Sequence, residues 1–79
     1  MVSQVAEKAA PRVRAARKAC GLTQAQLANA AGVSRQTVIA MERGDYAPSV
    51  YLALRIAAEL GSTVEELFGG APSTEGDHP

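Results

Sequence analysis

The chain has 79 residues, of which 47% are hydrophobic, 4% aromatic and 20% charged, and its formal net charge is zero. A chain this short forms one domain at most and leaves no room for a catalytic cleft beside a core, which argues against an enzyme. Many of the apolar residues are alanine, the strongest helix former, so the composition predicts an all-α domain.

Cysteine and histidine occur once each, as Cys20 and His78. A lone cysteine excludes an intramolecular disulfide and fits a cytoplasmic setting, and the two residues together cannot form a metal site of the usual kind. No apolar run reaches the about 18 residues of a membrane span, and the N-terminus lacks the pattern of a signal peptide. We therefore expect a cytoplasmic protein without metal, cofactor or membrane association, and nothing indicates a small-molecule ligand.

Charge is divided unevenly along the chain. Up to Arg43, seven basic residues stand against two acidic ones, a formal charge of +5, whereas from Gly44 onward one basic residue stands against six acidic ones, a formal charge of −5. A basic half can dock on phosphate while the acidic half points away. Charges scattered over a solvated surface would give the same count, so the charge division alone does not distinguish a phosphate-binding half from an ordinary surface.

The first predicted helix begins at Pro11, which suits a first helical turn, and ends at Gly21. Residues 1–10 are expected to be a flexible segment. Four residues at helical spacing form the inward face: Val13, Ala16, Arg17 and Cys20. Cys20 is expected to be a small core residue.

Two short helices joined by a tight turn follow, over the stretch from Gln24 to Arg43. Thr23 and Gln26 match a capping box at the start of the first helix, and Gly32 can adopt the left-handed conformation that the turn requires. The small Ala28, midway along the first helix, lets the second cross it closely. This arrangement is typical of a DNA-binding helix-turn-helix.

Ser34 caps the second helix of this pair, which opens with Arg35 and Gln36, whose side chains can hydrogen-bond base edges. Arginine can bind guanine O6 and N7, glutamine can bind adenine N6 and N7, and each such pair contributes about 1–3 kcal/mol of discrimination. The alternative is that both are ordinary exposed residues of a helix.

Two further helices complete the predicted domain. Ser49 caps one that ends at Gly61, and Thr63 caps a short last helix. The remaining residues are polar and rich in proline and glycine. The sequence therefore predicts five helices within residues 11–68, followed by a disordered tail at residues 69–79.

The joined pattern resembles the phage repressor and Cro-like helix-turn-helix regulators, the XRE-like family. It combines LTQ-x-x-LA, GVSRQT, ERG, a Pro-Ser helix start and a Leu-Gly pair before a short last helix, and it covers roughly residues 11–68. The resemblance implies a compact, lambda-repressor-like five-helix domain that lays its third helix in the major groove of double-stranded DNA.

The resemblance also implies roles for single residues. Tyr46 could instead pack on the fourth helix, and Asp45 stands where the family frequently has a basic residue. Base contacts fall to Arg35, Gln36 and Ala40. Phosphate contacts, which position the protein without selecting a sequence, fall to Thr23, Gln24, Thr37, Arg43 and Tyr46.

Arg17 and Glu42 match a pair that links the first and third helices in some relatives. An unpaired cation on the inward face of a helix would be costly. We therefore interpret Arg17 and Glu42 mainly as a structural ion pair, with direct DNA contact as the alternative.

One helix contacts only a few base pairs, so useful affinity requires two half-sites and predicts a homodimer. The family often dimerises through its last helices. Val64 and Phe68 supply an apolar face there, which fits either a dimer interface or the core of the monomer.

The leading interpretation is a sequence-specific transcriptional regulator that represses by occupying an operator. The alternative is an antitoxin-type protein-interaction module that binds a partner protein and represses its own promoter. A co-purifying small protein would distinguish the two. An enzyme is disfavoured because Cys20 has no base nearby in the sequence, and RNA binding is disfavoured by the lack of aromatic residues.

Overall fold

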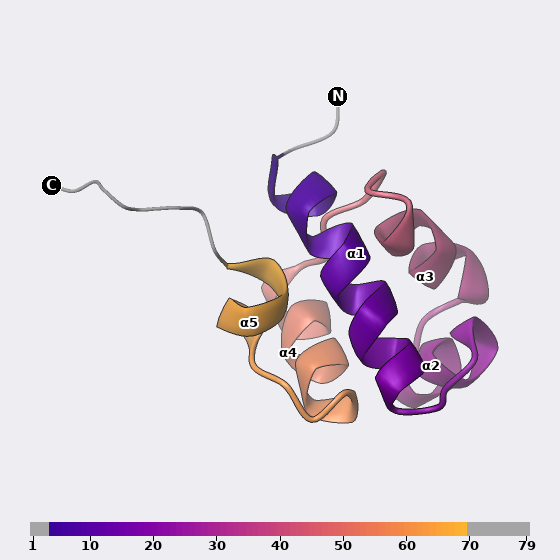
Figure 1. Cartoon of the computed structure of the whole chain (residues 1–79). Coiled ribbons are helices and arrows are strands. Elements are labelled where there is room, and N and C mark those ends of the chain that lie inside the picture. The colour runs from indigo at the N-terminus through magenta and orange to yellow at the C-terminus, as the bar shows by residue number, and fades with distance from the viewer. Residues whose placement is uncertain (1–3, 70–79) are drawn as a thin grey trace, which may run out of the picture.

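Five helices and no strand make up residues 4–69, the part of the chain that the computed structural model describes (Figure 1). The predicted all-α, five-helix fold is confirmed. The helices are α1 (Gln4–Ala19), α2 (Gln24–Ala31), α3 (Arg35–Glu42), α4 (Val50–Glu59) and α5 (Val64–Phe68). None of them combines the length and the apolar character that crossing a membrane would require.

The predicted caps begin the last four helices. Thr23 Oγ1 accepts from the N–H of Gln26 at 3.0 Å, and the N–H of Thr23 donates to Gln26 Oε1 at 2.8 Å, which completes the capping box of α2. Gly32 ends α2 with a φ of 74°, a conformation that is strained for residues with a side chain. The other three helices are capped by Ser34, Ser49 and Thr63.

The first helix is longer than the sequence predicts. It begins at Gln4, and Pro11 lies inside it, so the predicted start at Pro11 and the flexible segment expected before it are wrong over residues 4–10. A proline inside a helix costs about 3 kcal/mol. Alanine favours the helix, and three alanines at helical spacing bury themselves here, which offsets that cost: Ala6, Ala9 and Ala10.

Cys20 is a second correction. Cys20 directly follows α1 and its N–H still donates to the carbonyl of Ala16 at 3.1 Å, but Cys20 is exposed rather than part of the core. Its Sγ lies 3.5 Å from the carbonyl oxygen of Leu60. Of the predicted tail at residues 69–79, only Gly69 is within the described residues.

The core lies where α1 crosses in front of the other helices (Figure 1). α1 packs against α3 and α5, while α2 packs against α3 and α4. Ala28 is buried, as expected for the residue of α2 that α3 crosses closely. Phe68 is buried in this core and Val64 packs against it, so both residues contribute to the monomer. The largest fully buried side chains are Val13, Leu27, Val38, Met41 and Ile56.

Candidate nucleic-acid interface

The start of α3 presents Arg35 and Gln36 to solvent. Ser34 caps the helix through the N–H of Thr37, and its Oγ also lies 3.1 Å from Thr37 Oγ1. Ala40, one turn after Gln36, is partly exposed. Val38 and Met41 are buried on the opposite side, so the packing of α3 fixes which edge faces outward.

The beginning of α2 lies beside the beginning of α3. The contact that shows this is a long hydrogen bond of 3.5 Å, in which Arg35 Nη2 donates to Gln24 Oε1. Thr23 is exposed and serves as the N-cap of α2. The N-terminus of a helix favours anions, so Thr23 and Gln24 stand at a position suited to phosphate and next to the residue suited to bases.

A buried ion pair anchors α3 to α1. Arg17 Nε donates to Glu42 Oε2 at 2.5 Å, and Arg17 Nη2 donates to Glu42 Oε1 at 3.0 Å. Arg17 is 8% exposed and Glu42 only 3%. The hydrogen bond that Arg17 donates to Glu42 raises the pKa of Arg17 above its ordinary value. Arg17 Nη1 also donates to the carbonyl of Leu22 at 2.8 Å, so the pair is well satisfied.

Gln24 joins this pair to the exposed edge. Its Nε2 donates to Glu42 Oε1 at 3.2 Å. A carboxylate only accepts hydrogen bonds, so Gln24 must turn its amide nitrogen toward Glu42 and its carbonyl oxygen toward Arg35. We call this series of contacts through Arg17, Glu42, Gln24 and Arg35 the bracing network. It runs from a buried cation to a side chain that can contact a base.

The loop after α3 carries charges of both signs. Arg43 Nε lies 3.6 Å from Asp45 Oδ2, and both side chains are largely exposed. Such exposed pairs contribute little to stability, but the carboxylate partly neutralises the cation. Tyr46 is partly exposed in the same loop, and its role in phosphate binding stays a prediction.

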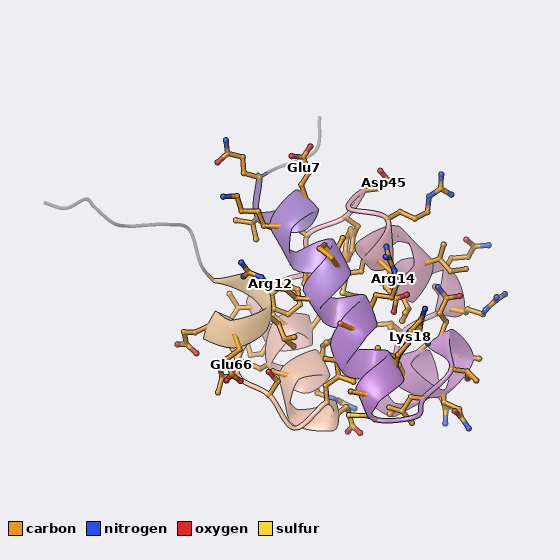
Figure 2. The ribbon with its side chains drawn as sticks, viewed as in Figure 1. Glu7, Arg12, Arg14, Lys18, Asp45 and Glu66 are labelled. Carbon is orange, nitrogen blue, oxygen red and sulfur yellow. The ribbon has the colours of Figure 1, made fainter. Side chains whose placement is uncertain are left out.

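Two basic residues of α1 belong beside these candidates, although the sequence analysis used them only in the total charge. Figure 2 shows Arg14 and Lys18 on the side of α1 that faces α2 and α3. Both are exposed, and Arg14 Nη2 donates to the carbonyl of Glu42 at 2.7 Å. Their spacing of four residues places them on one side of a helix. The inward residues of the first helix, as predicted from the sequence, did not indicate which exposed side of that helix faces α3.

Together these residues form a short exposed edge at the start of α3, flanked by the basic residues of α1 and by the N-terminus of α2. The family model described as "Helix-turn-helix" matches residues 13–67. The chain belongs to the helix-turn-helix family. This confirms the resemblance to the repressor and Cro-like regulators.

Several relatives of this helix-turn-helix protein are named as transcriptional regulators. An uncharacterised HTH-type transcriptional regulator of Methanothermobacter thermautotrophicus is 53% identical over 57 residues, which span 71% of this chain and 83% of that protein. The restriction-modification controller protein C.AhdI of Aeromonas hydrophila is 38% identical with a TM-score of 0.72, over 77% of this chain and 92% of that one.

A third relative is SinR, described as a master regulator for biofilm formation and solved in complex with DNA. It is 28% identical with a TM-score of 0.71, over 75% of this chain and 95% of that one. A second structure holds SinR together with SinI.

Proposed function

We propose that this protein is a sequence-specific regulator of transcription that binds double-stranded DNA, places α3 in the major groove and represses by occupying its operator. The observation that carries the proposal is the exposure of Arg35 and Gln36 at one end of α3, an end that the bracing network ties to α1 and α2. The DNA complex of the related SinR supports it.

The proposed contacts divide into those that select a sequence and those that position the protein. Base edges are contacted by Arg35, Gln36 and Ala40. Phosphates are contacted by Thr23, Gln24, Thr37, Arg43 and Tyr46, to which we add Arg14 and Lys18 from α1 because both are cations beside α3.

We further propose that two copies act together in the cytoplasm, one on each half-site of a symmetric operator, without metal or cofactor. A single α3 contacts too few base pairs for selective binding, and two-fold symmetry in the protein matches two-fold symmetry in the DNA.

Selection of bound duplexes from a random pool gives the operator, and single substitutions then test the roles. Arg35→Ala and Gln36→Ala should each lower the preference at one base position by roughly 5- to 150-fold, which corresponds to about 1–3 kcal/mol. Glu59→Ala, a change at an exposed residue of α4, is the control and should leave every preference unchanged. An unchanged operator preference in the double variant Arg35→Ala/Gln36→Ala would contradict the proposal.

A second candidate function is the antitoxin-type module, which binds a partner protein and represses its own promoter. The observation that favours it is the complex of the related SinR with SinI. Native mass spectrometry of the chain purified from its own cells would test this. A small protein bound at fixed stoichiometry would support the module, and a preparation without such a protein would count against it.

A further inference from the structure

Ile39, in the second turn of α3, is an apolar residue that the core does not use. It is partly exposed, and within residues 4–69 it belongs neither to the core cluster nor to the partly buried apolar residues packed against that cluster. Val38 and Met41, its neighbours on α3, are the buried residues there. A single exposed apolar residue is ordinary on a protein surface, so the position of Ile39 must show whether it has a role.

That position is the edge of α3 that carries the proposed base contacts. Ile39 follows Arg35 by four residues and Gln36 by three, spacings that put neighbouring side chains on one side of a helix. Arg43 follows Ile39 by another four residues and is largely exposed. Ile39 therefore lies in a row between two cations, and Ala40, which is also partly exposed, comes directly after it.

The edge of α3 is thus divided into a polar turn and an apolar turn. Arg35 and Gln36 in the first turn can form hydrogen bonds, whereas Ile39 and Ala40 in the second turn have no polar side-chain atom. A polar base edge opposite the second turn would lose water without gaining a hydrogen bond in return. Thymine is the base that presents an apolar group in the major groove, the methyl on C5.

Neither helix formation nor attraction to phosphate accounts for an isoleucine at this position. A β-branched residue loses side-chain freedom in a helix and is a poorer helix former than glutamine or lysine. An isoleucine brings no charge to a phosphate. A protein interface needs a far larger apolar area than one isoleucine between two cations offers. Contact with the apolar group of a base is the role that this position fits.

The rise of the helix gives the expected place of the thymine. Ile39 lies four residues after Arg35, which is about 6 Å along the helix axis, and successive base pairs are about 3.4 Å apart. A helix that follows the groove therefore places the two side chains one to two base pairs apart. The thymine should stand within two base pairs of the guanine that Arg35 contacts.

We propose that Ile39 contacts the C5 methyl group of a thymine in the operator and selects thymine over cytosine at that base pair. The proposal rests on the proposed function, because that function places α3 in the major groove. It adds Ile39 to the proposed base contacts as a residue that selects by apolar contact instead of hydrogen bonding.

Removing the methyl group from the DNA tests this contact. In the operator obtained by selection, each thymine of a half-site is replaced in turn by uracil, which lacks only the C5 methyl. Fluorescence anisotropy should show that the wild type binds one of these duplexes about 3- to 5-fold more weakly, the effect of losing one buried methyl group. That thymine should stand within two base pairs of the position at which Arg35→Ala loses its preference.

The variant Ile39→Ala tests whether Ile39 is the residue in contact with the methyl group. Alanine is a strong helix former, so the variant should fold, which circular dichroism verifies. It should bind the thymine and uracil duplexes equally, because the side-chain atoms that reach the methyl group are gone. Leu54→Ala, at an exposed apolar residue of α4, is the matched control and should keep the full difference seen in the wild type.

A second pair of duplexes separates the methyl group from the rest of the base. With cytosine in place of that thymine the wild type should bind more weakly, and 5-methylcytosine should recover about 3- to 5-fold, because it carries a methyl group at the same place. Ile39→Ala should bind these two duplexes equally. Equal binding of both by the wild type would contradict the proposal, since the polar edge of the base would then be what is selected.

Two further results would overturn the proposal. One is an operator without a thymine within two base pairs of the position that Arg35 selects. The other is a response to uracil that is the same in the wild type and in Ile39→Ala. Either result leaves the proposed function standing if Arg35→Ala and Gln36→Ala still change preference on the same operator. A chain that selects no operator at all would contradict both proposals.

Discussion

Gln24 lies between a buried carboxylate and an exposed guanidinium, and its two amide atoms face in opposite directions. The nitrogen donates to Glu42 and the oxygen accepts from Arg35. Arg35 is a long side chain whose rotamers must be restricted before it can contact a base edge, and restricting them costs up to about 2 kcal/mol. In the proposed complex, Gln24 supplies part of that restriction before DNA binds.

Gln24→Met keeps the size of the side chain and removes both hydrogen bonds. If Gln24 acts through Arg35, the variant should lose about 3- to 10-fold of the preference at the base that Arg35 contacts, a loss expected from one weak hydrogen bond. The same substitution in an Arg35→Ala background should then have no effect on preference. An equal loss of affinity for all duplexes in both backgrounds would instead identify Gln24 as a phosphate contact only.

At the scale of helices, the first half of α1 acts as part of the core. Ala6, Ala9 and Ala10 are buried, and a Cβ at Gly44 would lie 3.4 Å from the Cα of Glu7. Small residues on both sides therefore let the loop after α3 approach α1 closely. This contact helps to position the loop that carries Arg43 and Tyr46.

Deletion of residues 1–10 tests this packing. It should lower the free energy of unfolding by about 2–3 kcal/mol, since each buried alanine methyl contributes roughly 0.8 kcal/mol. Urea denaturation followed by circular dichroism measures the change. A truncated chain as stable as the full chain would show that residues 4–10 add nothing, as the sequence had suggested.

The short helix α5 depends on the capping carboxylate of Glu66. Its Oε1 accepts from Ser62 Oγ at 2.8 Å and from the N–H of Thr63 at 3.0 Å, and these bonds hold the pKa of Glu66 below its ordinary value of 4.5. A lowered folded pKa means that the stabilisation is fully present above the unfolded value and is lost as the pH falls through the folded one.

Glu66→Gln keeps an acceptor that does not titrate. The wild type should therefore lose more stability than this variant between about pH 5 and pH 3, the range below the ordinary carboxyl pKa. Urea midpoints at several pH values measure the difference. Glu65→Gln, at an exposed neighbour in α5, is the control and should follow the wild type. Parallel curves for the wild type and Glu66→Gln would disprove the role of the cap.

Local signals predicted most helix ends, because caps and turn glycines act through their immediate neighbours. Thr23, Ser34 and Gly32 are examples. The start of α1 was missed because burial of small residues against distant segments outweighed the proline signal. Helical spacing indicated the inward position of Arg17, but Glu42 as its partner was accessible only through the family resemblance.

Within the described residues 4–69, a formal charge of +5 up to Arg43 and one of −3 after it are folded into one small domain. Figure 2 shows Arg14 and Lys18 on the side of α1 toward α2 and α3, with Glu66 on the far side near α5. Asp45 and Glu7 are exceptions, since Asp45 lies in the loop after α3 beside Arg43 and the exposed Glu7 lies where α1 meets that loop. These acids oppose the attraction of this side to phosphate.

Asp45→Asn should tighten binding to every duplex by roughly 2- to 5-fold at low salt, because one unfavourable charge near phosphate is removed. The dependence of affinity on salt should steepen, while operator preference stays unchanged. Fluorescence anisotropy over a salt series measures both. Glu65→Gln removes an equal charge from α5 and should change affinity less. Equal gains from the two variants would show that only net charge matters.

The bracing network connects the interior of the domain to the residue proposed to select the operator. Any substitution that loosens Arg17 or Glu42 slightly should disturb Arg35 while the chain still folds. If the chain selects operators as proposed, alleles that weaken this pair without unfolding the domain would change promoter choice before they lower the protein level. Misregulation, rather than degradation, is then the first phenotype to expect from damage at this buried pair.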